Sequence, residues 1–599
     1  MRYLSLLLVL SWLMIGCTSA TREDPTSGAA ATVPGQSFSA LLENYFEERL
    51  QLHPFEATAI ADPRYNDQLP NDLSQAHRQQ LRAFYTKYLG QLDQIDSARL
   101  EGQERLSYGI FRRDMQMNLE GLTFHTHLMP INQFWSLPLT LAQYGSGASN
   151  QPFRTVQDYE NFLGRIRGFT EWTDTAIVNM RRGLARGITY PRVVMEKTLP
   201  QLRAVATADP TKSVYYGPIS KLPESFSSAD RERLTTAYTA AIREQVVPAY
   251  QKLHDFIQNE YLPKARTTHG ISAIPRGPEY YQYLIRYWTT TNLTPDQIFE
   301  TGQREVARIR QEMEQVKQQV GFQGDLQAFF RHVNTNPKFN PFQTEEEVLN
   351  AYRAIEQRMQ PQLNRLFNLV PKSAFEIRQT EKFREASASA EYNPPAPDGS
   401  RPGIFYVPII NPRQYNAVGM ESLFLHEAIP GHHYQISIQQ EQQDIPRFRQ
   451  YSWYGAYGEG WALYSESLGR ELGLYTDPYQ YFGRLSGEMH RAIRLVVDVG
   501  MHAKGWTREQ AIKYSLENEL SSEEEAIAEI ERYMVIPGQA LSYKIGEIKI
   551  RELRQRAERE LGTKFSVSAF HDEVLQDGGM PLEVLEAKIN DWIERQKKA

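Results

Sequence analysis

The sequence predicts a mainly α-helical protein with a few short strands. Segments with apolar residues at three- and four-residue steps recur along the chain, which is typical of helices that lay one face on a core. Only two short runs have the composition of strands. With 23% charged residues, 41% hydrophobic residues and a net charge of −6, the composition is that of a soluble globular protein. The length of 599 residues is enough for two helical lobes.

The predicted helices begin near residue 39. They cover residues 39–50, 74–95, 101–118, 156–184, 228–261, 295–320 and 345–367. The helix over residues 295–320 has the clearest ends, because Thr294 and Gln297 form a capping box and Gly321 follows the last turn. We expect one lobe over residues 38–290 and a second over residues 291–599.

Two short runs are predicted to be strands. The first is residues 193–195, which follow Pro191, and the second is residues 403–407. The second run lies between Pro402 and Pro408, and prolines are typical of edge strands. An edge strand close to a catalytic helix can pair with an extended peptide, although a short structural strand that covers the core is the simpler interpretation.

The N-terminus has the features of a lipoprotein signal. Arg2 precedes an apolar run over residues 6–15 that is too short to span a bilayer, so residues 1–16 are predicted to be a signal peptide. The run ends in a sequence that resembles a bacterial lipobox, with the lone cysteine, Cys17, as the predicted lipidation site. A plain secretory signal with a chance cysteine is the alternative. Residues 17–37 are rich in Ser, Thr, Ala, Gly and Pro and are predicted to be a flexible tether.

These features also bear on partners and location. Thr18 after the cysteine favours the outer membrane, by resemblance to Gram-negative lipoproteins, with the folded part facing the periplasm. The sequence contains no long basic run and no arginine-rich arm, so we expect no nucleic-acid partner. Contact with the membrane is expected through the lipid anchor only.

Residues 421–435 concentrate side chains that bind metals. His426 and Glu427 form the His-Glu pair with which zinc peptidases place an imidazole on the metal and a carboxylate beside the bound water. The usual second histidine comes four residues after the first, and Pro430 occupies that position. In an ideal helix the residue six positions after His426 is rotated about 240° away, so His432 does not meet His426 in a straight helix.

Pro430 and Gly431 are expected to remove this obstacle. Proline cannot donate a hydrogen bond to the carbonyl of His426, and glycine permits almost any turn, so the pair acts as a two-residue insertion that breaks the helix. His432 then returns toward His426. His433 is the alternative ligand, and histidines that cap a frayed helix end are the structural alternative.

The third ligand is predicted in the segment Gly458-Glu459-Gly460-Trp461-Ala462. Glu459 lies 33 residues after His426 at the start of a predicted helix, and Glu466 lies two turns further on the same face. The segment resembles the Asn-Glu-Gly-Phe-Ala element that supplies the third zinc ligand in membrane alanyl aminopeptidases. We therefore expect Glu459 to bind one zinc ion and Glu466 to orient a ligand imidazole.

An apolar helix over residues 489–502 carries polar residues at steps of four, namely His490, Arg494, Asp498 and His502. A satisfied ion-pair ladder between helices is one interpretation. In the functional interpretation, His490 or Arg494 contacts the carboxylate or backbone of a substrate and Asp498 supports the metal ligands.

A further motif over residues 532–546 contains two tyrosines. Tyr533 is expected to contact substrate, and Tyr543, which follows a Pro-Gly-Gln-Ala turn, is expected to donate a hydrogen bond to an oxyanion.

The three motifs together resemble a bacterial family catalogued as domain of unknown function 885. They are His-Glu-x-x-Pro-Gly-His-His, Gly-Glu-Gly-Trp-Ala-Leu-Tyr-x-Glu and Arg-Tyr-x-x-x-Pro-Gly-Gln-Ala-x-x-Tyr-Lys-x-Gly. The resemblance also includes residues 52–58 and 277–281, so it covers nearly the whole mature chain. It implies a largely helical, zincin-like metallopeptidase that is often a lipoprotein.

The sequence thus predicts a zinc-dependent oligopeptidase or dipeptidase of the bacterial envelope. Zinc is held by His426, His432 and Glu459, Glu427 is the general base, and a deep channel between two lobes admits peptides but not folded proteins. The first alternative is a lipid-anchored peptide-binding or assembly protein with a structural or vestigial metal site, which would have no need of Glu427. The second is a zinc amidase that acts on cell-wall peptides.

Overall fold

The computed structural model describes residues 37–598, except for 381, 383–384, 386–388, 397–398 and 400. The predicted signal peptide and Cys17 lie outside the described residues. Phe38–Ala599 form one compact unit, and its division into two lobes near residue 290 stays a prediction. No helix in the described part of the chain is both long and apolar enough to cross a membrane.

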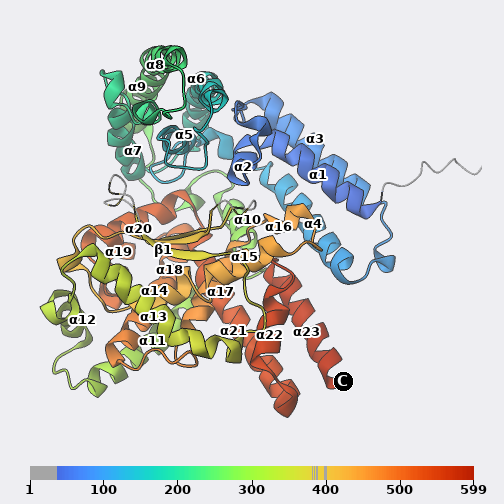
Figure 1. Ribbon diagram of the computed structural model, residues 1–599, viewed down its shortest axis with the longest axis vertical. Coiled ribbons are helices and arrows are strands. Elements are labelled where there is room, and N and C mark those ends of the chain that lie inside the picture. Colours follow the sequence, from blue (N-terminus) through green and yellow to red (C-terminus); the bar gives the residue numbers. More distant parts are fainter. Residues whose placement is uncertain are drawn as a thin grey trace, which may run out of the picture. The chain divides into compact units, whose positions relative to one another are not determined.

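The fold is mainly α-helical, as predicted, with one small sheet (Figure 1). The first thirteen helices are α1 (Phe38–Leu52), α2 (Pro54–Ala59), α3 (Gln75–Leu92), α4 (Gly102–Gly121), α5 (Leu137–Gly145), α6 (Val156–Arg186), α7 (Arg192–Val205), α8 (Ser228–Ala241), α9 (Val247–Phe256), α10 (Gly277–Thr289), α11 (Pro295–Gln319), α12 (Leu326–Thr335) and α13 (Glu345–Leu366). The strands β1 (Phe375–Gln379), β2 (Glu391–Asn393) and β3 (Gly403–Val407) follow. The remaining helices are α14 (Met420–Glu427), α15 (His432–Glu441), α16 (Arg447–Gln450), α17 (Gly455–Ser467), α18 (Pro478–Ala503), α19 (Arg508–Asn518), α20 (Glu523–Val535), α21 (Ser542–Leu561), α22 (Val567–Leu575) and α23 (Leu582–Lys598).

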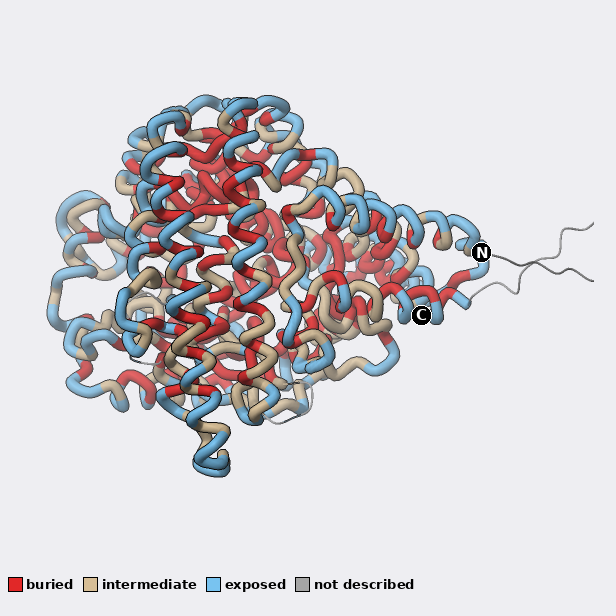
Figure 2. Tube along the Cα trace, turned by 90° about the horizontal axis from the view of Figure 1, so that it is seen from above, coloured by how far each residue is buried: buried red, intermediate tan, exposed pale blue. Residues whose placement is uncertain are grey.

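The helix predicted over residues 295–320 is α11, and its ends are as predicted. The Thr294 hydroxyl accepts a hydrogen bond from the Gln297 N–H, and the Gln297 side chain accepts one from the Thr294 N–H. Gly321, just past the end, has a φ of 71°. The alternation of exposed and buried residues along the helices, seen in Figure 2, follows the apolar periodicity of the sequence.

The strand predicted at residues 193–195 is wrong, because these residues belong to α7. Pro191 is the residue that caps this helix, and the buried side chains of Val194, Met195, Thr198 and Leu202 follow a helical period. A three-residue apolar run after a proline is compatible with a strand or with the first turn of a helix. The longer period decides in favour of the helix.

The strand predicted at residues 403–407 is present as β3, but its position at an edge is wrong. The strand order is β1-β3-β2, so β3 is the middle strand, parallel to β1 and antiparallel to β2. All five of its residues are buried. Pro402 and Pro408 lie outside the strand, so every N–H within it can pair with a neighbour. Both edges of β3 are therefore occupied, and no peptide can add to it.

Buried charges connect three of the long helices. The ammonium group of Lys544 on α21 lies 3.0 Å from a carboxylate oxygen of Glu305 on α11, 2.6 Å from Glu488 on α18 and 2.9 Å from Glu547 on its own helix. Lys544 and Glu488 are fully buried, so each charge depends on the others for its stability. This cluster fixes α18 and α21 against each other.

Helices α17 and α21 pack through glycine. A Cβ atom on Gly460 of α17 would lie 2.5 Å from the Cα of Gly546, and one on Gly546 would lie 1.8 Å from the carbonyl oxygen of Ala456. Neither position tolerates a side chain without separation of the two backbones. Because α17 carries Glu459 and α21 carries Tyr543, this contact sets the distance between two predicted site residues.

We expect Gly460→Ala to destabilise the fold, because the new methyl group meets only backbone atoms of Gly546 and Glu547. The loss in the free energy of unfolding should be about 1–3 kcal/mol, measured by urea denaturation. Gly90→Ala is the matched control, because Gly90 lies inside α3 with nothing within 4 Å of the added Cβ. That variant should be neutral or more stable by up to about 1 kcal/mol. Equal stability of the two variants would contradict the packing argument.

Candidate metal centre

The chain breaks between α14 and α15 at the position predicted from Pro430 and Gly431. Helix α14 ends at Glu427 and α15 begins at His432. A Cβ atom on Gly431 would lie 2.0 Å from the carbonyl oxygen of His426, so only glycine fits there. The indole N–H of Trp461 donates a hydrogen bond of 2.9 Å to the carbonyl oxygen of Pro430. Since Trp461 lies on α17, this bond ties the break to the helix that carries Glu459.

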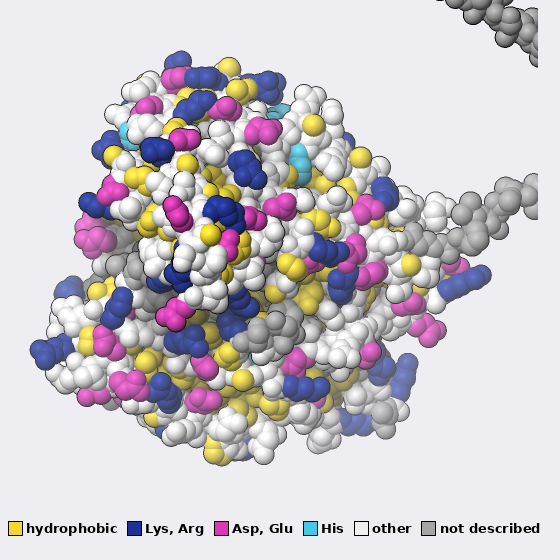
Figure 3. All heavy atoms as spheres, turned by 45° about the horizontal axis from the view of Figure 1, so that its top comes forward, with side chains coloured by type: hydrophobic (Ala, Val, Ile, Leu, Met, Phe, Trp, Pro, Cys, Tyr) yellow, Lys and Arg dark blue, Asp and Glu magenta, His cyan; other side chains and the backbone are white. Residues whose placement is uncertain are grey.

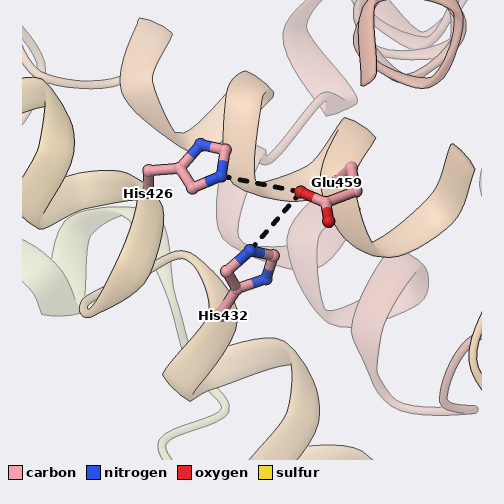
Figure 4. A group of neighbouring side chains, drawn as sticks. All are labelled: His426, His432 and Glu459. Carbon is pink, nitrogen blue, oxygen red and sulfur yellow. Dashed lines mark ion pairs between the residues drawn. The ribbon is translucent and has the colours of Figure 1, made fainter. Parts of the chain in front are cut away.

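The break brings His426, His432 and Glu459 together from three helices (Figure 4). The Nε2 atoms of both histidines lie 3.6 Å from the same carboxylate oxygen, Oε2 of Glu459. One donor atom from each residue lies within 4.8 Å of the other two. The two imidazole rings have centroids 5.0 Å apart and are nearly perpendicular. Three side chains of the types that bind transition metals thus converge on one point.

Glu466 orients the first histidine. Its Oε1 atom lies 2.8 Å from Nδ1 of His426, and both side chains are buried. This bond leaves Nε2 of His426 facing Glu459, as in sites where a carboxylate fixes the ring of a metal ligand. Burial lowers the pKa of His426, but the carboxylates of Glu459 and Glu466 outweigh burial and raise the pKa to about 9. Burial raises the pKa of Glu459, but His426 and His432 outweigh burial and hold this pKa below its usual range.

Glu427 lies next to the cluster on the wall of a cleft of about 890 Å³. Burial raises the pKa of its carboxyl group, and the neighbouring His426 and His432 oppose this shift. The cleft is also lined by residues of α18, α20 and α21, including Tyr543. Figure 3 shows a hollow on one face of the molecule with Lys and Arg side chains gathered around it. The cleft volume of about 890 Å³ is within the range of about 300–1,000 Å³ that is typical of sites for small ligands.

His433, the alternative ligand, faces the sheet. Its Nδ1 atom lies 2.9 Å from the hydroxyl of Tyr392 on β2 and 3.3 Å from that of Ser437. Gly403 of β3 packs against it, because a Cβ atom there would lie 2.9 Å from the same nitrogen. Burial lowers the pKa of His433 to about 4. Among the described residues, His433 is not part of the group that converges on Glu459.

The polar stripe on α18 divides into two parts. His490 and Arg494 line the cleft. Asp498 is fully buried and accepts hydrogen bonds from the Tyr281 hydroxyl at 2.6 Å and from the Gly538 N–H at 3.1 Å. His502 accepts a hydrogen bond from the N–H of Ile271 at 3.0 Å. The structure therefore places Asp498 in contact with the turn before α21, where its hydrogen bonds support that turn and not the three clustered residues.

Arg494 connects the two predicted tyrosines. Its Nε atom donates to the hydroxyl of Tyr533 at 2.9 Å, and its Nη2 atom donates to Glu529 at 2.9 Å. Its guanidinium carbon lies 4.6 Å from the centroid of the Tyr543 ring. Tyr533 is buried behind Arg494, so the structure places it as a support for Arg494. Tyr543 is on the cleft wall.

Arg491 and Trp453 are among the cleft residues that the sequence did not predict. Arg491 follows His490 and donates to the carbonyl oxygen of Gly487 at 3.2 Å, and it forms no ion pair within the described part of the chain. Trp453 lies in the loop before α17, and its ring centroid is 5.9 Å from that of His432. Trp453 stands in an aromatic run shortly before Glu459, and that proximity is the signal that points to it in the sequence.

Three comparisons relate the chain to known proteins. A family model described as "Bacterial protein of unknown function (DUF885)" matches residues 54–589. A search of curated proteins gave no match. A crystal structure described as that of a "putative lipoprotein" from Colwellia psychrerythraea is 28% identical, with a TM-score of 0.85, over 93% of this chain and 99% of that chain. A structure described as that of a "putative lipoprotein of unknown function" from Shewanella oneidensis is 19% identical, with a TM-score of 0.72, over 92% of this chain and 99% of that chain. This second match shows similarity of fold.

Asp498 is expected to make stability depend on pH. Burial raises the pKa of its carboxyl group to about 7, although hydrogen bonds from Tyr281 and Gly538 and the charge of Arg532 oppose the shift. Its contribution to stability is therefore present below the unfolded pKa of about 4 and is lost as pH rises through about 7. The free energy of unfolding of the wild type, relative to Asp498→Asn, should fall by about 3 kcal/mol between pH 4 and pH 7.

Urea denaturation at several pH values measures this difference. The amide oxygen of the substituted side chain remains an acceptor for Tyr281 and Gly538, so the Asp498→Asn variant is expected to fold. Asp444→Asn, at an exposed loop position, is the control and should leave the pH dependence unchanged. Parallel curves for the wild type and Asp498→Asn would show that Asp498 does not titrate in this range.

Proposed function

The chain belongs to the bacterial family DUF885, and we propose that it is a zinc-dependent peptidase which hydrolyses oligopeptides or dipeptides in the bacterial envelope. One observation carries the proposal. Two imidazole nitrogens and a carboxylate oxygen converge on one point, and the carboxylate of Glu427 lies beside them on the wall of a cleft. A purely structural metal site would have no use for Glu427 at that position.

The residues present fit a zinc ion. Two histidines and one glutamate are a usual ligand set of catalytic zinc. His426, His432 and Glu459 would hold the ion, and Glu466 would keep the imidazole of His426 in the orientation that binds it. When bound, zinc lowers the pKa of its water toward neutrality and polarises the carbonyl group of a substrate.

The other cleft residues would carry the proton and the developing charge. Glu427 accepts a proton from the attacking water and donates it to the leaving amine, for which its cleft position and raised pKa are suited. The hydroxyl of Tyr543 donates a hydrogen bond to the carbonyl oxygen as charge develops there. Arg494 holds the Tyr543 ring against the cleft wall through the contact of their planar groups.

The substrate is a peptide in an extended or loosely folded form. A cleft of about 890 Å³ among helices admits a few residues and excludes a folded domain. Arg491 and His490 lie on the cleft wall, where they can contact a carboxylate or the backbone of the substrate. Arg491 is the better candidate to bind a substrate carboxylate. His490 and Arg494 already contact carboxylates of the protein, those of Glu519 and Glu529 respectively.

The location is proposed from the N-terminus and from the similar structures. Two similar solved structures are described as putative lipoproteins, and the lipobox-like sequence that ends in Cys17 supports the same processing in this chain. The mature chain would then be anchored by the lipid on Cys17. We propose the outer membrane, with the folded part facing the periplasm.

Replacement of the general base tests the proposal. Wild-type protein should bind one equivalent of zinc, measured by elemental analysis after dialysis, and should cleave members of a peptide library. Glu427→Gln should keep the zinc, since Glu427 is not among the three converging residues, and should lose activity by about 10²–10⁴-fold. Equal cleavage by both proteins would exclude this mechanism. A folded wild type without stoichiometric metal, or with metal but no cleavage of peptides or muropeptides, would exclude the peptidase.

The role of Glu466 predicts a separate effect on metal affinity. Glu466→Gln removes the carboxylate that accepts from Nδ1 of His426, and we expect zinc to bind about 10–100-fold more weakly. Competition with a chromogenic chelator measures the affinity. Glu471→Gln is the matched control, because Glu471 lies just beyond the same helix and, among the described residues, forms an ion pair only with Arg554 at the surface. Zinc affinity that is equal in the two variants would contradict the orienting role.

A further inference from the structure

A second cavity adjoins the cleft. It has a volume of about 420 Å³ and is formed by residues of α1, α2, α4 and α10 and by residues 448–455. Figure 1 shows α1, α2 and α4 near α10 and α16. Trp453 lines both the cavity and the cleft, and the adjacent residues Phe134 and Trp135 line the cleft and the cavity respectively. The two spaces thus meet at the same aromatic side chains.

These side chains are unusually exposed. Among the described residues, four large aromatic side chains are exposed, namely Phe134 at 49%, Trp135 at 59%, Tyr287 at 44% and Trp453 at 47%. All four line the cleft or the second cavity. Scattered apolar residues at a surface need no explanation, but a cluster of them at a concave surface is typical of a binding site.

Trp453 is fixed between the proposed metal ligands and the second cavity. Its ring packs against His432, with 5.9 Å between the centroids. A Cβ atom on Gly458 would lie 2.2 Å from the Trp453 ring, so the indole rests directly on the backbone of the first turn of α17, next to Glu459. A ligand side chain in the second cavity would therefore be separated from two proposed metal ligands, His432 and Glu459, only by the indole of Trp453.

The charged groups of the cavity are already paired. Arg49 and Glu56 form an ion pair of 2.7 Å, and Asp114 accepts a hydrogen bond of 2.6 Å from the Tyr454 hydroxyl. Because these charges satisfy one another, the cavity offers a ligand mainly aromatic surface. An uncharged, apolar group gains most from such a site, since burial of apolar surface is favourable and aromatic rings add specific contacts.

We propose that this second cavity is the subsite that binds a bulky apolar or aromatic side chain of the peptide next to the bond that is cleaved. The inference rests on the proposed function, because it places a peptide at His426, His432 and Glu459. The enzyme then prefers peptides with Phe, Tyr, Trp or Leu at one position beside the cleaved bond. Trp453 is a specificity-determining residue that separates this subsite from the metal.

A binding measurement tests the subsite without turnover. Isothermal titration of the full folded chain, with and without zinc, compares N-acetyl-phenylalanine amide with N-acetyl-alanine amide. We expect binding of the phenylalanine derivative to be at least about tenfold tighter, from the apolar area of the ring, in both metal states. Ala59→Trp places a large side chain in the cavity wall and should abolish this difference. Ala83→Trp, on the exposed face of α3, is the matched control and should preserve it.

Cleavage of a peptide series supplies the second readout. Peptides that differ only by Phe or Ala at each position should show a preference of about tenfold or more for Phe at one position, and Ala59→Trp should reduce that ratio. Equal binding of the two amides, or a Phe-to-Ala ratio that Ala59→Trp leaves unchanged, would overturn the subsite while the peptidase stands. Absence of all cleavage together with the expected difference in binding would overturn the peptidase and leave an aromatic binding site.

Discussion

The contact between Gly431 and the carbonyl oxygen of His426 is the constraint on which the site depends. With no side chain at residue 431, the chain turns sharply enough for His432 to face His426. The hydrogen bond from Trp461 to the carbonyl of Pro430 then fixes this turn on α17. Helix α17 thus carries the carboxylates of Glu459 and Glu466 and is hydrogen-bonded to the break between α14 and α15, which carry the two histidines.

The opposite wall is held by buried charge. Lys544 on α21 and Glu488 on α18 are both fully buried and form an ion pair, and the partly exposed Glu305 joins α11 to Lys544. An unpaired charge at the buried positions would be very unfavourable. Arg494 and Tyr543 project from two of these helices and contact each other at the cleft. The close glycine packing of α17 and α21 connects this wall to the helix that carries Glu459. Both sides of the cleft are therefore positioned by contacts that leave little room for displacement.

The proposed chemistry and the proposed specificity come from different parts of the chain. The clustered residues, Glu427 and Tyr543 all lie after residue 420. The second cavity, by contrast, is built largely from α1, α2, α4 and α10, which meet the later helices at residues 448–455. In this arrangement the early helices shape what is bound, while the later helices carry the reacting groups. Trp453 belongs to both, because its ring lies between His432 and the cavity.

Local patterns in the sequence determined the helical class, the ends of α11 and the break at Pro430 and Gly431, because capping and proline geometry act within a few residues. Glu459 was selected through the resemblance of its segment to a known zinc-binding element, and helical spacing placed Glu466 on the same face. They did not determine that residues 193–195 are helical or that β3 is a middle strand, since both depend on neighbours that are distant in the sequence. Only the tertiary structure decided that His433 faces Tyr392, that Asp498 contacts Gly538, and that Arg491 and Trp453 reach the cleft. The direction of a side chain on a given helix face depends on what packs against that face, and spacing along one helix does not contain this information.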